Sequence, residues 1–225
     1  AVAHLAYRVG RGGALLRAGT PPALPGHMMA VDAKGYTPAA GDGARLCPRI
    51  LGECAAQGYA AIVADWEFPP DPAALALSAA LAKGAAEAGI PLYLPEHLAR
   101  QEGPERVMIS SALSGGSFLL RLEETQARFG RDRAVLALCP CREEFTLPAP
   151  TGCGRPLSPG ALREKMERFR PAVFFSRDLC ANYFTYRPGP ESVSLVLFDN
   201  ERSLGEKLAC ARHLGVPAVL MAYPE

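Results

Sequence analysis

The amino-acid sequence predicts an α/β fold, specifically a (β/α)8 TIM-type barrel that is irregular or lacks one βα unit. Short apolar runs alternate almost from end to end with helix-like stretches rich in Ala, Leu, Glu, Lys and Arg, the pattern of βα units around a parallel sheet. The length of 225 residues suits one such barrel, so we expect a single domain over 1–225. Pro and Gly are frequent at 145–157 without a change of composition afterwards, which predicts a loop over the barrel and an insertion at about 145–190.

Eight apolar runs have the length of strands and are bounded by Gly, Pro or polar residues. A ninth run at 172–175 leads into the aromatic segment 182–186, and it fits either a barrel strand or the first arm of an inserted hairpin. The count of barrel strands is therefore open by one. The predicted strands are 3–9, 27–32, 61–67, 91–94, 106–110, 134–138, 193–199 and 218–223.

Four helices are marked by their end signals. Asp71 followed by Pro72 has the form of an N-cap and a first-turn proline, and Gly89 falls where a C-cap glycine belongs. Ser158 repeats the N-terminal signal before Pro159, and Gly215 ends the last helix. The predicted helices are 45–57, 71–88, 158–168 and 203–214.

The composition excludes several classes of function. The 24 Lys and Arg residues against 23 Asp and Glu give a net charge of +1, which does not predict a basic surface for binding nucleic acid. Apolar residues make up 49% of the chain, but no apolar run of about 18 residues occurs, so no membrane span is expected. The glycine-rich turns lack the spacing that holds a phosphate, and we expect no nucleotide or other cofactor.

The seven cysteines include no C-x-x-C pair, so a metal site is not expected. Cys139 and Cys141 form the one close pair, which is either a reactive thiol pair or two buried small hydrophobic residues in a reducing compartment. The chain starts at Ala1 without a methionine, which suggests a trimmed form. The expected compartment is accordingly either the cytoplasm or, with a signal segment removed, an exported or spore-associated location.

An acidic pair ends the third predicted strand, in the sequence Ile-Val-Ala-Asp-Trp-Glu at 62–67. Strand residues two apart share a face, so Asp65 and Glu67 should point the same way and Trp66 the opposite way. In a parallel βα barrel, the carboxyl ends of the strands carry the chemistry. This position makes Asp65 and Glu67 the candidate catalytic residues, against the simpler reading that they cap a helix or meet solvent.

Other polar residues follow the predicted strands, and taken singly each fits a helix cap or a surface position as well as a substrate contact. A pocket with several carboxylates and aromatic faces is typical of sugar binding. His97, which follows Glu96 in the sequence, fits either a general base or a structural hydrogen-bonding residue. The candidate substrate-binding residues are Asp32, Tyr36, Glu96, Asp199 and Tyr223.

The segment 57–67 resembles the signature strand of the family 18 glycoside hydrolases, D-G-x-D-x-D-x-E preceded by a helix and often by Gly and an aromatic residue. The segments 198–208 and 214–221 are similar to the closing unit of that family, a strand ending in an aromatic-Asp step, a helix and a last strand. The likeness covers 27–225, and the closing unit is most similar to the spore-coat and germination branch of the family.

This resemblance implies that Glu67 is the proton donor and that Asp65 orients the acetamido group of the substrate in a substrate-assisted, retaining hydrolysis. The first Asp, the Gly and the middle Asp of the signature are replaced by Ala60, Ala61 and Val63. Two neighbouring carboxylates can share a proton, and Val63 removes one member of that relay. The resemblance therefore implies an activity that is reduced or lost.

The leading hypothesis is a barrel that hydrolyses or binds an oligosaccharide or peptidoglycan-type glycan containing N-acetylglucosamine. The last-strand Trp of the family is replaced by Ala222 or Tyr223, and a tyrosine face can still stack on a sugar ring. A second hypothesis is a non-catalytic scaffold. A third, an unrelated barrel lyase or aldolase, is less favoured because no strand lysine or cluster of metal ligands stands out.

Overall fold

A computed structural model describes residues 3–19, 26–149, 154–189 and 192–221. The chain divides into two compact units, each described below by itself. The first unit contains residues 1–109, 125–137 and 216–225, and the second contains residues 110–124 and 138–215.

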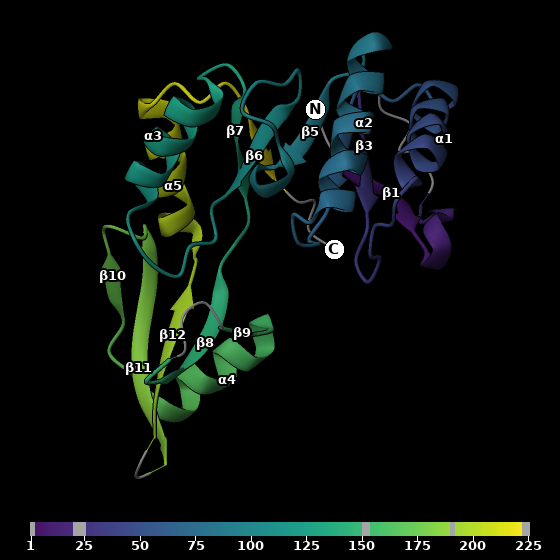
Figure 1. Cartoon of the computed structure of the whole chain (residues 1–225). Coiled ribbons are helices and arrows are strands. Elements are labelled where there is room, and N and C mark those ends of the chain that lie inside the picture. Colours follow the sequence, from purple (N-terminus) through teal and green to yellow (C-terminus); the bar gives the residue numbers. More distant parts are fainter. Residues whose placement is uncertain (1–2, 20–25, 150–153, 190–191, 222–225) are drawn as a thin grey trace. The chain divides into compact units, whose positions relative to one another are not determined.

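The first unit is built on an eight-stranded sheet. Its strands are β1 (Ala3–Val9), β2 (Leu15–Arg17), β3 (Met28–Asp32), β4 (Ile62–Asp65), β5 (Leu92–Pro95), β6 (Arg106–Ser110), β7 (Ala134–Leu138) and β13 (Val219–Met221). They lie in the order β13-β7-β6-β5-β4-β3-β1-β2 and form a curled half-barrel (Figure 1). The pairs β1–β3, β3–β4, β4–β5 and β5–β6 are parallel, while β2 runs antiparallel to β1 at one edge.

The prediction of eight strands around one barrel is corrected at one strand. The apolar run predicted at 193–199 forms β12 (Ser192–Phe198), which belongs to a separate sheet and pairs antiparallel with its neighbours. The composition of a buried strand does not reveal whether its partners run parallel or antiparallel. The sequence therefore could not distinguish a strand of the barrel from a strand of a second sheet. Within the described residues the first sheet has β13 and β2 as its two edges.

Two helices cover one face of this sheet, α1 (Asp42–Ala56) and α2 (Pro72–Glu87), which lie against each other (Figure 1). Leu46 of α1 and Leu81 of α2 are fully buried in the same core as Trp66, the residue that follows β4. Burying each such leucine contributes about 1.5–3 kcal/mol. The predicted cap of α2 is confirmed, since the Asp71 carboxylate accepts a hydrogen bond from the Ala74 amide at 2.8 Å.

The opposite face of the sheet carries a smaller apolar cluster. Met28, Ala61 and Val63 are buried there, and Ala30 and Tyr93 pack against them. Ala30 is the register partner of Val63, which in turn pairs with Tyr93, so these side chains form a row across β3, β4 and β5. This row lies two residues before the ends of β3, β4 and β5, directly beneath the strand-end residues on the same face.

The second unit contains a five-stranded sheet and a helix that packs on it. Its elements are β8 (Arg142–Leu147), β9 (Arg155–Pro156), α4 (Pro159–Phe169), β10 (Phe174–Ser176), β11 (Ala181–Gly189) and β12, in the sheet order β10-β11-β12-β8-β9 (Figure 1). Phe184 and Val196 are fully buried on the face against which Leu162 and Met166 of α4 pack. Of the two readings of the run at 172–175, the inserted hairpin is the one the structure contains, as β10 and β11.

The segment 145–157, predicted as a loop, is partly strand. It contributes residues 145–147 of β8 and the short β9, which pairs with Glu143 and Glu144 of β8, while residues 150–153 lie outside the described residues. The remaining elements are the helices α3 (Phe118–Phe129), which the sequence did not predict, and α5 (Glu201–His213), with the short 3-10 turns η1 (Arg11–Gly13) and η2 (Glu96–Leu98).

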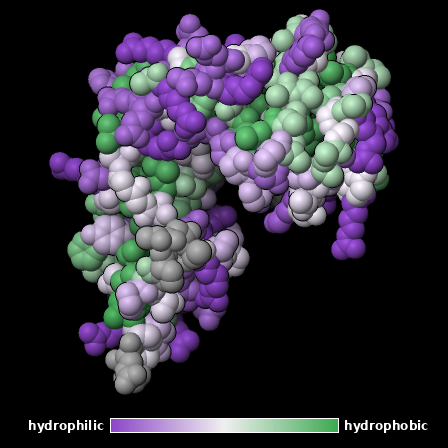
Figure 2. Space-filling view, in the orientation of Figure 1, coloured by the Kyte–Doolittle hydropathy of each residue, from purple (hydrophilic) through white to green (hydrophobic). Residues whose placement is uncertain are grey.

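The surface mixes polar and apolar residues. In Figure 2 hydrophobic residues reach the surface over α2, where Leu75 is 41% exposed, and at the β10 edge, where Phe174 is 54% exposed. None of the helices described here combines the length and the apolar character needed to cross a bilayer.

The first unit should lose stability in weak acid because of His4. Its ring lies 5.8 Å from that of His27 and 3.5 Å separates its Nε2 from the Tyr59 hydroxyl. Burial, and then the nearby His27, lower the pKa of His4 below its usual 6.5. The resulting stability is present above about pH 6.5, the pKa in the unfolded chain, and is lost as the pH falls below it.

Urea unfolding at pH 7.5 and pH 5.5 measures this effect. The midpoint should fall on acidification, and the fall should shrink in His4→Gln but not in the control His213→Gln, whose histidine is exposed on α5. An equal fall in His4→Gln would contradict the assignment.

Candidate functional site

Asp65 is the last residue of β4, and Glu67 follows two residues later. Trp66 between them is only 2% exposed and packs in the core under α1 and α2, with its ring 5.3 Å from that of Phe68. Asp65 and Glu67 are exposed, whereas Val63, two residues before Asp65, is buried in the small apolar cluster. The alternation along β4 thus places Asp65 on the side of that cluster, and Glu67 follows just beyond the end of the strand.

Asp32 at the end of β3 is the register partner of Asp65. It forms an ion pair with Arg8 of β1, with 3.2 Å between Arg8 Nε and Asp32 Oδ2, and it accepts a hydrogen bond from the Lys34 amide at 2.7 Å. Arg8 also pairs in register with Asp32. Three neighbouring strands therefore bring Arg8, Asp32 and Asp65 side by side.

Sequence reasoning missed Arg8, and the reason is a bulge. The register of β1 against β3 shifts between Leu5 and Tyr7, so that Leu5 pairs with Ala30 while Arg8 pairs with Asp32. An unbroken period of two along β1 would have put Arg8 on the helix side with His4. The only signal in the sequence is that Arg8 is the one Lys, Arg, Asp or Glu residue of this strand.

The surroundings of Asp65 change its titration. The pKa of Asp65 is raised above its usual value, first by the loss of hydration around its carboxyl and then by repulsion from Asp32 and Glu67, while Lys34 acts in the opposite direction. Although the residue as a whole is exposed, the crowding of its carboxyl by neighbouring groups removes part of the surrounding water. Raised carboxyl pKa values of this kind are frequent at functional sites.

Glu67 lines a pocket of about 240 Å³ between the loops that follow β3 and β4. Lys34 and Tyr36 line the same pocket from the β3 side. The Tyr36 hydroxyl donates a hydrogen bond to Asp42, and its ring lies edge-on to Phe68 with 6.5 Å between the centroids. Tyr36 is therefore held in place as a wall, with its hydroxyl engaged by the protein.

The η2 turn adjoins this loop. His97 Nε2 lies 3.2 Å from the Phe68 carbonyl oxygen, one residue after Glu67, which gives His97 a structural hydrogen bond. Glu96 is half-buried in the same turn, directly after β5. The first unit thus contains Asp32, Tyr36 and Glu96 with the acidic pair, and Tyr223 lies outside the described residues.

Asp199 belongs to the second unit and its carboxylate is occupied. Lys207 Nζ donates to it at 2.6 Å, and the Ser203 hydroxyl and the Cys141 amide each donate at 2.8 Å. The side chains of Asp199 and Lys207 are 0% and 1% exposed. These contacts join the end of β12 to α5 and to the start of β8, which is a structural role.

Within the described ranges no three His, Cys, Asp or Glu side chains gather as metal ligands. Lys34 is a cationic neighbour of Asp65, and Arg8 forms its ion pair with the adjacent Asp32. Such a group of carboxylates at the ends of adjacent parallel strands can transfer protons and accept hydrogen bonds from a ligand.

Parallel βα barrels carry their active sites at the carboxyl ends of the strands, where these acids lie. No family model and no curated protein matches the sequence. The fold is similar to that of a chitinase from Chromobacterium violaceum, with a TM-score of 0.70 and 13% identity over 98% of this chain and 85% of that chain. It is also similar to a family 18 chitinase from Cycas revoluta, with a TM-score of 0.57 and 14% identity over 87% and 75%.

A third similar structure is the spore cortex-lytic enzyme SleL of Bacillus megaterium, with a TM-score of 0.64 and 16% identity. The match covers 97% of this chain and 62% of SleL, so the chain spans less than two thirds of that enzyme. At these identities the likeness concerns the fold. The chain has a divergent form of the fold of the family 18 glycoside hydrolases.

Proposed function

We propose that the protein is a glycoside hydrolase that acts on a glycan containing N-acetylglucosamine. The observation that carries this proposal is the position of Asp65 and Glu67, both exposed at the carboxyl end of β4, with Glu67 lining a pocket. The similarity of the fold to chitinases and to a spore cortex-lytic enzyme supports the substrate class.

In this proposal Glu67 donates its proton to the glycosidic oxygen as the bond to the anomeric carbon breaks. The acetamido oxygen of the same sugar attacks that carbon, and the carboxylate of Asp65 accepts a hydrogen bond from the acetamido N–H and stabilises the positive charge that develops. Water then opens the cyclic intermediate and returns a proton to Glu67, so the anomeric configuration is retained.

Asp32 supplies a carboxylate beside Asp65. Within β4 itself that carboxylate is missing, because Val63 stands where the family signature has its middle Asp. Asp32 lies opposite Asp65 in register, and Arg8 and the Lys34 amide hold it there. We assign Asp32 to this electrostatic role rather than to direct contact with the sugar. The missing relay member of β4 is thereby replaced by a residue of β3.

Incubation with chitohexaose and with peptidoglycan glycan strands tests the proposal. We expect new reducing ends, and we expect the first product of chitohexaose to have the β configuration in proton NMR spectra. Inverted products, or no turnover together with no binding of either glycan, would contradict it.

The Asp32 role predicts a change in the pH profile. Asp65 must be ionised to accept the acetamido N–H, and Asp32→Asn removes a like charge, so the pKa of Asp65 should fall. The acidic limb of the profile of kcat/KM against pH should therefore move to lower pH. The control Asp132→Asn, an exposed acid in the turn before β7, should leave the profile unchanged. A limb that stays in place or moves upward would contradict the role.

Non-catalytic glycan binding is the second candidate, favoured by Val63 at the middle position of the signature. Saturable binding of chitohexaose without new reducing ends, weakened in Asp65→Asn, would support this candidate. Turnover that depends on Glu67 would exclude it.

A further inference from the structure

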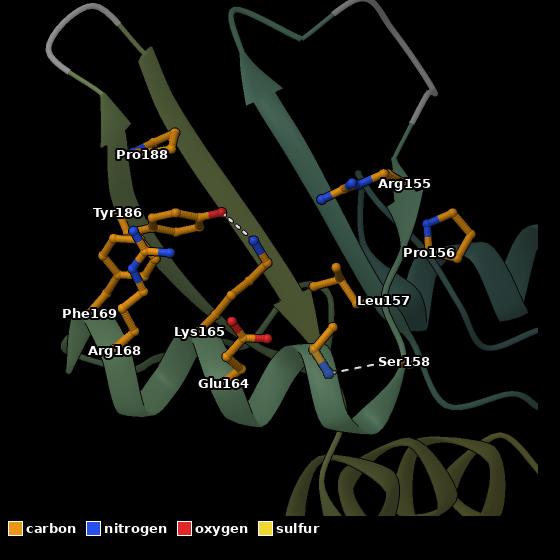
Figure 3. Close-up of a pocket in the computed structure, with 11 residues that line it drawn as sticks. Arg155, Pro156, Leu157, Ser158, Glu164, Lys165, Arg168, Phe169, Tyr186 and Pro188 are labelled. Atoms are coloured by element: carbon orange, nitrogen blue, oxygen red, sulfur yellow. Dashed lines mark hydrogen bonds between the residues drawn. The ribbon is translucent and has the colours of Figure 1, made fainter.

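The second unit contains a pocket of about 460 Å³ between α4, β9 and β11 (Figure 3). This volume lies in the range of about 300–1,000 Å³ that is usual for small-molecule sites. All the residues that line the pocket belong to the second unit, which contains none of Asp32, Asp65 and Glu67.

Cationic side chains predominate around the pocket. Arg155 extends from β9, and Lys165 and Arg168 project from α4, while Glu164 is the one carboxylate among the lining residues (Figure 3). Glu144, bonded to two of these cations, adds a second negative charge. Three cations against two carboxylates leave the pocket with an excess positive charge.

Buried contacts hold two of the cations in place. Glu144 accepts hydrogen bonds from Arg155, at 2.5 Å, and from the Tyr186 hydroxyl, and Lys165 Nζ lies 3.0 Å from it. Burial alone would raise the pKa of Glu144, but the hydrogen bonds from Tyr186, Arg155 and Lys165 lower it to about 2, so the group is ionised at neutral pH. Lys165 is also fixed by its hydrogen bond to the Tyr186 hydroxyl at 2.6 Å.

Arg155 keeps donor capacity for a ligand. A guanidinium has five N–H donors, and the contact with Glu144 engages Nη2 of a side chain that is 71% exposed. Ser158, the N-cap of α4, also lines the pocket, so the positive end of the helix dipole adds to the field. Arginine forks bind carboxylates through two parallel hydrogen bonds.

The remaining walls are apolar. Leu157, Ala161 and Pro188 line the pocket, and the Phe169 and Tyr186 rings stack on each other with 4.3 Å between their centroids. Apolar walls beside a group of cations, two of them bonded to Glu144, suit a ring-shaped organic anion better than a bare inorganic ion. We propose that this pocket binds the carboxylate of an acidic sugar, such as the lactyl-bearing sugar of a peptidoglycan-type glycan. The choice of sugar rests on the proposed function, whereas the binding of a carboxylate stands on the pocket alone.

N-acetylmuramic acid and N-acetylglucosamine form a matched pair of probes, since they differ by the lactyl group that carries the carboxylate. We expect N-acetylmuramic acid to bind the intact protein at least tenfold more tightly in calorimetric titrations. That preference should be lost in Arg155→Ala and in Arg168→Gln. It should persist in Arg163→Ala, an exposed arginine of the same helix that does not line the pocket.

Arg168→Gln keeps the test valid if Arg155→Ala disturbs the contacts of Glu144. Equal binding of the two sugars, or a preference that survives both pocket variants, would overturn the proposal. Inorganic phosphate that binds as tightly as N-acetylmuramic acid would also overturn it, because the pocket would then recognise any anion. Glu67→Gln should retain the preference, which separates this test from the test of hydrolysis.

Discussion

Glu67→Gln should lower kcat for chitohexaose by about 10²- to 10⁴-fold, the usual contribution of a positioned general acid. Glutamine keeps the size and hydrogen-bonding capacity of the side chain but has no proton to give to the leaving oxygen. Because Glu67 is exposed at the edge of its pocket, the fold should tolerate the change. KM should change much less than kcat, since the missing interaction forms in the transition state.

Glu87→Gln is the matched control, because Glu87 is an exposed acid in the last turn of α2, outside the pocket. It should leave kcat unchanged. Turnover by Glu67→Gln at the wild-type rate would show that another group protonates the leaving oxygen, and the catalytic assignment would then be wrong.

Lys207→Met should destabilise the second unit by about 3–5 kcal/mol, the usual cost of breaking a buried ion pair by removing one partner. Lys207 and Asp199 are fully buried and their charged atoms lie 2.6 Å apart. Without Lys207 the Asp199 carboxylate keeps its bonds to the Ser203 hydroxyl and the Cys141 amide but loses its counter-charge. Urea unfolding followed by circular dichroism measures the loss.

The double variant Asp199→Asn with Lys207→Met provides the control, because it removes both charges from the same buried place. Its free energy of unfolding should exceed the value expected from adding the two single losses. A single Lys207→Met variant that unfolds within about 0.5 kcal/mol of the wild type would contradict the role assigned to this pair.

Most strands of the first sheet could be predicted because they are mainly apolar runs with clear ends, whereas the short edge strand β2 was not predicted. Residues 62–65 are apolar up to the terminal Asp, since both faces of β4 are covered up to that point. The strands at 3–9, 106–110 and 134–138 have the bounds that the sequence predicts. Here the local composition and the final packing agree.

The second sheet could not be predicted in the same way, because its strands depend on partners distant in sequence. β8 carries Glu143 and Glu144, which look like loop residues in the sequence. Glu144 is tolerated inside the unit because Arg155, Lys165 and Tyr186, from three later elements, neutralise and bond it. No short window of sequence contains that compensation.

The exposure of Asp65 and Glu67 on either side of the buried Trp66 could be predicted from the sequence, but the surroundings of the two acids could not. Asp32 was predicted as a site residue, whereas its partner Arg8 depends on the bulge in β1. Asp199 has the same aromatic-Asp context that made it a candidate, yet the helix that follows it supplies Lys207 and Ser203 as partners. Whether an acid at the end of a strand has a structural role or stays available to a ligand thus depends on the partners that the following element supplies.

A crystal structure determined with chitotriose would show whether a sugar reaches Asp65 and Glu67. We expect the sugar to bind beyond the ends of β3 and β4, with an acetamido nitrogen within hydrogen-bonding distance of the Asp65 carboxylate and a glycosidic oxygen next to Glu67. Chitotriose bound elsewhere, with both carboxylates facing only water, would contradict this expectation.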